Sequence, residues 1–222
     1  MLSLSSAFAD ESAEAKGATS GDEILLQDGR VVRLKSIKAA LPEAKAFLES
    51  VVSRNILVLE DEAEDRYGRV TGTATIQGEE KSVEEKLLRE GSAFVYPVLD
   101  DERLDAYFES EREVRLGKRG FWADSKDVPA AEAKKLYRKY GFVAGTVSKT
   151  ERVKNKVFLS FGAQDLPDFM VVIAARHLRA LKKRGMDPLL LAGKTLRIRG
   201  WVGGDTVPAI ILTDPHQIEG VE

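Results

Sequence analysis

The chain has 222 residues, 43% of them hydrophobic and 32% charged, which is the profile of a globular protein and not of a fibrous or disordered one. It has no Cys and two His, so disulfides, thiolate metal sites and cysteine nucleophiles are excluded and a zinc site is not expected. The charge is uneven, because residues 1–129 carry 18 Lys and Arg against 27 Asp and Glu, whereas residues 130–222 carry 16 against 9. The acidic first part is therefore not expected to bind nucleic acid strongly without specificity, whereas the surplus of the second part is either a basic binding face or ordinary solvated surface.

The first residues have the pattern of the end of a secretory signal peptide. The run from Met1 to Ala9 ends in an Ala-x-Ala pattern and is followed by Asp10, but it lacks a basic start and its apolar core is short. Residues 1–19 are therefore either the remainder of a signal peptide, which predicts a periplasmic or secreted protein, or a disordered N-terminus. No apolar run approaches the roughly 20 residues that span a bilayer, so no transmembrane segment is expected.

Apolar runs separated by turn residues follow. Asp28-Gly29 lies between two such runs and predicts a β-hairpin, Pro42 and Glu43 open a helix, and Ser82 caps another helix that Gly91 ends. An acidic turn is expected over 60–68. Strands are predicted over 24–27, 31–37, 56–59, 70–76 and 93–95, and helices over 42–53, 82–90 and 101–116.

A linker is expected over 125–137, and a second set of elements follows it. Strands are predicted over 142–147, 157–161, 169–173, 195–202 and 209–213, with a basic helix over 175–184 that ends at Gly185. The order of three strands, a helix and two strands is typical of a five-stranded Greek-key barrel of the type that binds oligonucleotides or oligosaccharides (OB). The second domain is therefore predicted to be an OB-like barrel over 138–222.

Two arginines in the first half indicate a phosphate site. Arg33 lies in the predicted strand 31–37, and Arg69 closes the tight sequence Asp65-Arg66-Tyr67-Gly68-Arg69. A guanidinium group offers fixed, permanently charged donors to two phosphate oxygens. These motifs, together with Gly21-Asp22, Pro42-Glu43-Ala44 and Gly120-Phe121-Trp122-Ala123, resemble the staphylococcal nuclease (thermonuclease-like) family over about residues 20–124.

This resemblance implies an OB-like barrel over 20–124, and hence a mainly β, α+β chain with two tandem OB-like barrels. The family's chemistry uses a Ca²⁺ ion held by carboxylates, a glutamate that activates water and two arginines that stabilise the phosphate. Arg33 and Arg69 match the arginines and Asp22 matches one metal carboxylate, whereas Lys38 stands where a second metal aspartate is expected. Glu43 follows Ile37 by six positions where the family has four, so its match to the catalytic glutamate is displaced.

Several interpretations of these residues stay open. Ca²⁺ needs about six or more oxygen ligands, so Asp22 alone cannot hold it and no cofactor is expected unless the protein is a working nuclease. Glu43 is either a helix-start residue or a displaced base, and Lys38 either opposes a metal or adds a third cation for phosphate. Arg33 and Arg69 either bind phosphate or pair with nearby carboxylates.

The second half offers a basic surface. Arg179, Lys182, Lys183 and Arg184 load the predicted helix 175–184, which either binds a polyanion such as single-stranded nucleic acid or docks on the acidic first domain. Trp122 and Trp201 are expected to be core or interdomain anchors and not stacking platforms.

The leading hypothesis is a thermonuclease-like protein with a degenerate phosphodiesterase site that serves as a binding or scaffolding module for nucleic acid or another phosphorylated ligand. The alternatives are an active Ca²⁺-dependent nuclease that hydrolyses phosphodiester bonds, and a protein–protein adaptor.

Overall fold

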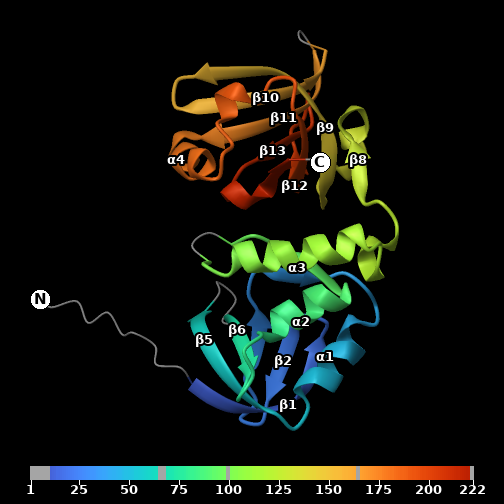
Figure 1. Ribbon diagram of the computed structural model, residues 1–222, viewed down its shortest axis with the longest axis vertical. Coiled ribbons are helices and arrows are strands. Elements are labelled where there is room, and N and C mark those ends of the chain that lie inside the picture. Colours follow the sequence, from blue (N-terminus) through green and yellow to red (C-terminus); the bar gives the residue numbers. More distant parts are fainter. Residues whose placement is uncertain (1–10, 65–68, 99–100, 164–165, 221–222) are drawn as a thin grey trace, which may run out of the picture. The chain divides into compact units, whose positions relative to one another are not determined.

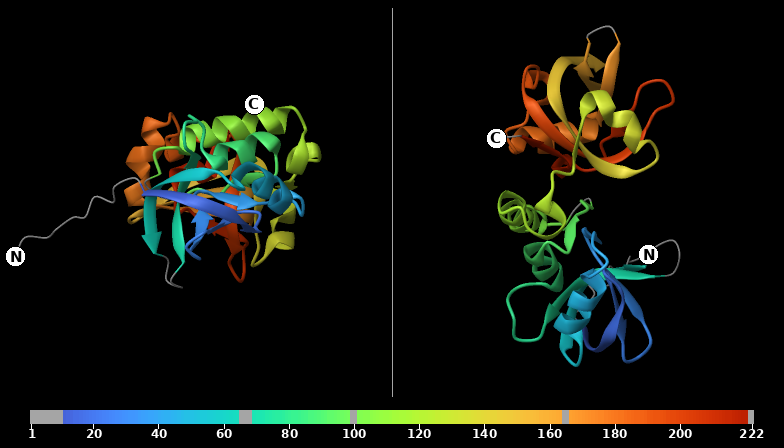
Figure 2. Two further views of the ribbon diagram at one scale, coloured as in Figure 1. Left: turned by 90° about the horizontal axis from the view of Figure 1, so that it is seen from below. Right: turned by 90° about the vertical axis from the view of Figure 1, so that its right-hand side faces the viewer.

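The computed structural model describes residues 11–64, 69–98, 101–163 and 166–220, which form two compact units, Met1–Asp124 and Ser125–Glu222. Each unit is built on a ring of five strands that can be followed in Figures 1 and 2. The predicted signal-peptide residues 1–9 lie outside the described residues. Among the described residues, no helix has both the length and the apolar content needed to cross a membrane.

The first unit is a closed barrel with strand order β1-β2-β3-β6-β5. The alternation of the sequence places Ile24, Leu26, Val32 and Leu34 inside and their neighbours outside. Neighbouring strands are antiparallel except β3 and β6, which run parallel. The strands are β1 (Glu11–Ser20), β2 (Glu23–Leu26), β3 (Val31–Leu34), β5 (Ile56–Glu64) and β6 (Val70–Ile76).

Helices and a small sheet complete the described part of this unit. The predicted cap of α2 is confirmed, because the Glu85 N–H donates to the Ser82 hydroxyl at 3.2 Å and Gly91 ends the helix with φ of 78°. The α-helices are α1 (Ala44–Val52), α2 (Val83–Glu90) and α3 (Leu104–Leu116), followed by the 3₁₀ helix η1 (Gly120–Ala123). The small sheet pairs β4 (Ile37–Ala39) with β7 (Ala93–Val95).

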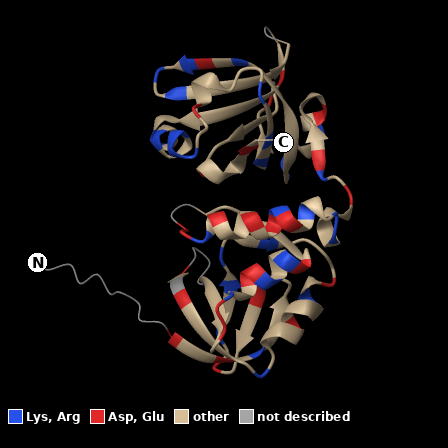
Figure 3. Cartoon of the chain, viewed as in Figure 1, with Lys and Arg blue, Asp and Glu red and all other residues tan. Residues whose placement is uncertain are grey.

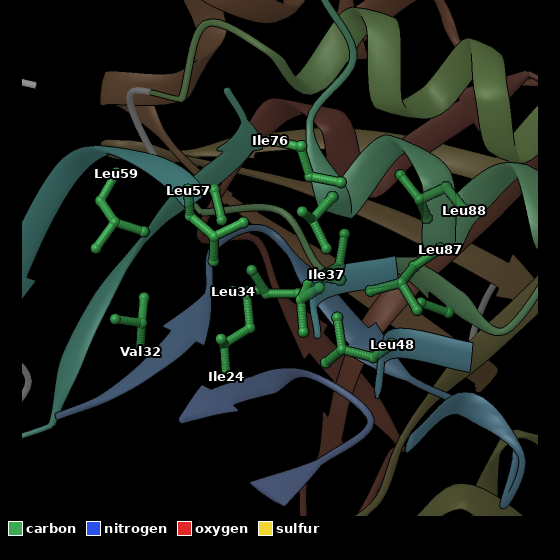
Figure 4. Close-up of a cluster of buried hydrophobic side chains, with 14 of the residues drawn as sticks. Ile24, Val32, Leu34, Ile37, Leu48, Leu57, Leu59, Ile76, Leu87 and Leu88 are labelled. Atoms are coloured by element: carbon green, nitrogen blue, oxygen red, sulfur yellow. The ribbon is translucent and has the colours of Figure 1, made fainter. Parts of the chain in front are cut away.

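The core of the first unit fills the barrel and continues to the helices packed against it (Figure 4). Strand residues such as Leu57 and Leu59 meet helix residues such as Leu48 and Leu87, and all four are at most 1% exposed. Burial of side chains of this size contributes about 1.5–3 kcal/mol each before conformational entropy is counted. The barrel therefore supplies a rigid wall for the residues on its outer face.

The second unit repeats the same strand order. Its ring runs β9-β10-β11-β13-β12 and closes through the pairing of β12 with β9, and β11 and β13 are again the parallel pair. The ring strands are β9 (Tyr140–Val153), β10 (Lys156–Gly162), β11 (Pro167–Ala174), β12 (Thr195–Gly203) and β13 (Ala209–Ile211). The remaining elements are β8 (Asp127–Pro129), η2 (Ala130–Leu136), α4 (Ala175–Lys183), η3 (Pro188–Leu190), η4 (Pro215–Gln217) and β14 (Ile218–Gly220).

The structure corrects three predicted boundaries. The barrel begins at Glu11 and not near residue 20, because β1 pairs with both β2 and β5. The expected acidic turn 60–68 is in part strand, since β5 continues to Glu64, and residues 65–68 lie outside the described residues. The segment 125–137, expected as a linker, contains β8 and η2, and β8 pairs with β9 while Ala133 of η2 is buried in the core of the second unit.

Candidate phosphate site

Arg33 is presented on the outer face of the first barrel. It lies on β3 between two buried residues, Val32 and Leu34, so its side chain projects away from the core. Glu23 on β2 is its cross-strand neighbour on one side and Thr71 on β6 on the other. The Arg33 side chain is 32% exposed, which leaves the guanidinium group accessible to a ligand.

Arg69 reaches the same outer face from the start of β6. It directly precedes β6, which begins at Val70, and its contact with Glu23 of β2 places its guanidinium group beside that strand. Its Nη1 lies 3.7 Å from Oε1 of Glu23, the cross-strand neighbour of Arg33. Glu23 is therefore both the cross-strand neighbour of Arg33 and the ion-pair partner of Arg69.

Asp22 lies beside Arg33, at the turn between β1 and β2. Its Oδ2 is 4.0 Å from Nη2 of Arg33 and accepts a long hydrogen bond, 3.5 Å, from the Ala39 N–H, while its Oδ1 accepts from the Ser20 hydroxyl at 2.9 Å. The backbone carbonyl of Asp22 accepts from the Leu34 N–H, which ties this turn to β3. Asp22 is thus held in place by protein donors.

Lys38 and Glu43 lie close to this turn along the chain. Lys38 is opposite Phe94 in the β4–β7 pair, and alternation directs its side chain to the other face of β4 from that of Ala39, whose N–H binds Asp22. Glu43 is exposed and immediately precedes α1, and its carbonyl accepts from Phe47 in the first turn. No bond from its side chain caps the helix.

The described residues do not fit a bound Ca²⁺ ion. Their His, Asp and Glu side chains form no group of three or more arranged to hold a metal. Both oxygens of Asp22 already accept hydrogen bonds, and the neighbouring carboxylate, Glu23, lies beside Arg69. Because Ca²⁺ takes about six to eight oxygen ligands, no catalytic step is assigned to a metal in this part of the chain.

What the arrangement offers is anion binding. Two guanidinium groups present several donors to a phosphate, and Arg33 is held by a strand, which positions a side chain more precisely than a loop does. Asp22 and Glu23 would keep the two arginines extended when no anion is bound. The described residues at this site are therefore suited to hold a phosphate.

The first unit also has a pocket of about 420 Å³ against β5, β6, α2 and α3. Neither Arg33 nor Arg69 lines it. Its one lining cation, Arg103, is paired with a carboxylate of the lining. Four lining residues are acidic, which disfavours an anionic ligand: Glu60, Glu79, Glu80 and Glu85.

The four basic residues predicted to bind a polyanion lie on α4 or directly after it, and Figure 3 shows this helix largely in the colour of Lys and Arg. Arg179 and Lys183 are exposed. Lys182 is also exposed, but its ammonium group lies 2.9 Å from Asp187. Arg184 is half-buried. The helix α4 therefore presents exposed positive charge, and Asp187 partly neutralises the charge of Lys182.

The two tryptophans differ from one another. Trp122 is 4% exposed, as expected for a core anchor. Trp201, which was expected to be a core or interdomain anchor, is 55% exposed, so its assignment to a core was wrong. The reason is register, because the inward positions of β12 are Ile198, Gly200 and Val202 and Trp201 falls between them.

The first unit is a closed ring of five strands, and α1 lies in the connection between the third and fourth strands along the chain. Two arginines lie on its outer face. The unit therefore belongs to the class of OB-type barrels with a charged outer site. A family model described as Staphylococcal nuclease homologue matches residues 33–124, so this unit contains a staphylococcal nuclease-like domain. The second unit lies outside the matched range. Comparison with curated proteins finds no match. A domain of this family indicates nucleic-acid binding or nuclease activity.

Sequence reasoning missed Glu23 and Ser20 as parts of the site. Glu23 pairs with Arg69, and Ser20 orients Asp22. A signal for Glu23 was present, since it directly follows Asp22 and alternates with the buried Ile24, but its contact with Arg69 depends on the order in which β2, β3 and β6 pair. Ser20 gave no signal of its own.

Proposed function

We propose that the protein is a staphylococcal nuclease-like binding module. In this proposal Arg33 and Arg69 hold a phosphate of nucleic acid, or of another phosphorylated ligand, on the outer face of the first barrel. The phosphodiesterase site is degenerate and cleaves slowly or not at all. The family match supports the ligand class, and the geometry around Arg33 supports the binding role.

The contact between Arg33 and Asp22 is the observation that carries this proposal. At 4.0 Å it is longer than a hydrogen bond, so it does not consume the donors of the guanidinium group. Arg197 is bound much more tightly, because it donates to both oxygens of Asp127 at 2.6 and 2.5 Å. An arginine fixed in that way has a structural role, whereas Arg33 retains the ability to grip an oxyanion.

The proposed loss of hydrolysis is supported by the surroundings of Asp22 and Glu43. Asp22 accepts hydrogen bonds from Ser20 and Ala39, and Glu43 is exposed at the start of α1. A nuclease of this kind needs a bound metal and a base aimed at a water molecule. Asp22 is already engaged by protein donors and Glu43 is open to solvent, so we expect little or no phosphodiester cleavage.

Binding is tested with a fluorescently labelled single strand and, separately, with inorganic phosphate as competitor. Arg33→Gln should weaken binding of the full chain about tenfold or more, because a hydrogen bond to a charged group contributes about 1.5–3 kcal/mol. Arg30→Gln is the matched control, since Arg30 lies in the same hairpin but is paired with Asp28 at 2.7 Å and with Glu11 at 2.5 Å. Equal affinities for the two variants would contradict the proposal.

A working nuclease is the second candidate. It is favoured by the close approach of Gly21 to Ala44, where an added Cβ would come within 2.7 Å, because this contact brings the start of α1, and with it Glu43, near the turn that carries Asp22. Cleavage of denatured DNA is measured with and without Ca²⁺ for the wild type and for Glu43→Gln. Ca²⁺-dependent cleavage that Glu43→Gln abolishes would establish the nuclease and overturn the degenerate site.

A protein–protein adaptor is the remaining alternative, and the same measurements separate it from the other two. An adaptor would bind neither strand nor phosphate at low salt and would cleave nothing. Retention of strand binding that falls with salt would reject it.

A further inference from the structure

A second surface with the chemistry of a nucleic-acid site lies on the second barrel. Its centre is Trp201 on β12, whose cross-strand neighbour on β9 is Tyr140. Tyr137 lies three residues before Tyr140 and is 39% exposed. We call Tyr137, Arg138, Lys139, Tyr140 and Trp201 the Trp201 surface.

The exposure of Trp201 is costly and its position is fixed. A tryptophan that is 55% exposed leaves a large apolar area in water, and Ile211, which the register of β12 and β13 places opposite Trp201, is 68% exposed. The Trp201 ring stands nearly perpendicular to that of Tyr140, with an angle of 80° and centroids 6.2 Å apart. An exposed ring held by an aromatic neighbour is prepared for a planar partner.

The support for this ring continues into the barrel wall. Tyr140 is packed edge-on against Phe142, with centroids 6.3 Å apart, and the guanidinium of Arg199 lies 5.2 Å from the centre of the Phe142 ring. Arg199 is fully buried and paired with Glu219 at 2.5 Å. Trp201 therefore stands at the solvent end of a connected row of rings and charges that restricts its motion.

Positive charge flanks the same stretch of β12. The Arg138 N–H donates to the Val202 carbonyl at 2.8 Å, and the Val202 N–H donates to the Lys139 carbonyl at 3.0 Å, so both basic residues lie beside the strand that carries Trp201. Arg138 and Lys139 are exposed, and the Arg138 guanidinium lies 5.5 Å from the centre of the Tyr137 ring. One carboxylate, Asp205, accepts from the Tyr137 hydroxyl at 3.2 Å.

From this combination we infer that the Trp201 surface binds single-stranded nucleic acid. A base stacks on the exposed ring of Trp201, and Arg138 and Lys139 contact the adjoining phosphates. Exposed rings alone would fit many apolar partners, but rings flanked by two cations, in a half of the chain with 16 Lys and Arg against 9 Asp and Glu, select a ligand that is both planar and anionic. A duplex should bind this surface more weakly, because its bases are stacked on one another and do not offer their planar faces to Trp201. The inference does not rest on the Arg33 site.

The test uses the full chain and labelled oligo-dT and oligo-U of about 12 nucleotides at low salt, with a duplex of equal length for comparison. Trp201→Ala should weaken binding of either strand by about fivefold to a hundredfold, and Trp201→Phe, which keeps a π face, should recover part of the loss. Ile211→Ala is the matched control, because Ile211 is exposed on the same sheet face but has no ring. Equal losses from Trp201→Ala and Ile211→Ala would show simple apolar docking and overturn the inference.

Intrinsic fluorescence provides a readout that a structural role would not produce. Stacking of a base should quench Trp201, so the wild type should lose intensity on binding, while Trp201→Phe, which retains the buried Trp122, should not. The double variant Arg33→Gln, Arg69→Gln should keep this quenching even if the proposed function is correct. Loss of affinity in that double variant together with unchanged affinity in Trp201→Ala would sustain the proposed function and refute the Trp201 surface.

Discussion

The two barrels share a topology but place different chemistry at the same position on it. In both, the third and fifth strands are the parallel pair, and a helix fills the connection between the third and fourth strands. On the outer face of that pair, the first barrel sets Arg33 beside Thr71, whereas the second sets Val172 beside Ile211. A shared fold therefore fixes where a side chain points and leaves open what it does.

The barrels also bury opposite kinds of ionisable group. In the first, Glu84 is fully buried, and burial raises its pKa to about 8. In the second, His177 is 3% exposed, and burial, together with the charge of Arg176, lowers its pKa. Burial disfavours the charged form of each group, which is the anion of Glu84 and the cation of His177. The stability of the first unit should therefore fall as pH rises, and that of the second unit should fall as pH decreases.

The largest expected effect tests whether the two barrels are independent. Leu57 and Leu159 are both 0% exposed, but they belong to separate cores. Leu57→Ala and Leu159→Ala should each destabilise the unit that contains it by about 2–5 kcal/mol through lost burial and the cavity left behind. In calorimetry each variant should lower one melting transition and leave the other in place. A single transition that both substitutions lower equally would show that the barrels unfold as one.

The next effect concerns the buried acid of the first barrel. Glu84 accepts from the Ala74 N–H with both oxygens, at 3.3 and 3.4 Å, and the charge of Arg103 only partly offsets its burial. Because its pKa is raised from an ordinary 4.5 to about 8, its stabilising contribution is complete below about pH 4.5 and is lost as pH rises through about 8.

Glu84→Gln should therefore stabilise the first unit by up to a few kcal/mol at pH 8.5 relative to wild type, and by much less at about pH 5. Denaturant unfolding at the two pH values measures this difference. Glu85→Gln is the control, since the Glu85 carboxylate pairs with Arg89 at 2.9 Å near the surface. A pH-independent difference between Glu84→Gln and wild type would contradict the raised pKa.

These results show where sequence reasoning succeeds and where it stops. The capped helix α2 and the strands β6 and β7 were predicted within a residue of their observed bounds. The strand β1 was missed because Glu11–Ser20 is polar and rich in Ala, and its place depends on backbone pairing with β2 and β5. A hydrogen bond of 2.5 Å from the Ala18 N–H to Glu49 of α1 also holds it, and no local pattern reveals such a contact.

The candidate sites show the same limit. Arg33 and Arg69 were recognisable because each lies in a motif, but the role of Glu23, which neighbours Arg33 across the strands and pairs with Arg69, follows only from the strand order. Whether the Trp201 side chain points to the core or to solvent depends on which residues of β12 point inward. The pairing of β12 with β9, some 60 residues earlier in the chain, sets these positions. Residue types can thus suggest a chemistry, whereas the register decides which of them meet.

A smaller effect is expected from the buried base of the second barrel. Burial and the charge of Arg176 lower the pKa of His177, and the charge of Asp214 opposes them in part. A histidine with a lowered pKa contributes stability that is present above its ordinary value of 6.5 and is lost as pH falls below it.

Replacement of His177 by Gln should accordingly flatten the fall in stability of the second unit between about pH 7 and 5, as followed by thermal melting. His216→Gln is the natural comparison, because His216 is the other histidine of the chain and its Nδ1 lies 2.9 Å from Asp214. If acid destabilisation of the second unit is unchanged in His177→Gln, the buried base does not set it.

The smallest expected effect distinguishes general electrostatic attraction of a nucleic-acid strand from binding at a defined site. It compares cations of the basic second half with cations of the acidic first half. Arg179 and Lys183 are exposed on α4, so Arg179→Gln with Lys183→Gln should weaken strand binding by only a few fold and lower the slope of log affinity against log salt by about 1. The quenching of Trp201 fluorescence on strand binding should persist, because the α4 cations attract the strand but do not stack on its bases. Lys45→Gln with Lys81→Gln, two exposed cations of the acidic first unit, should change the slope less. A larger slope change from the first-unit pair would show that the strand runs over the first barrel and not over the second.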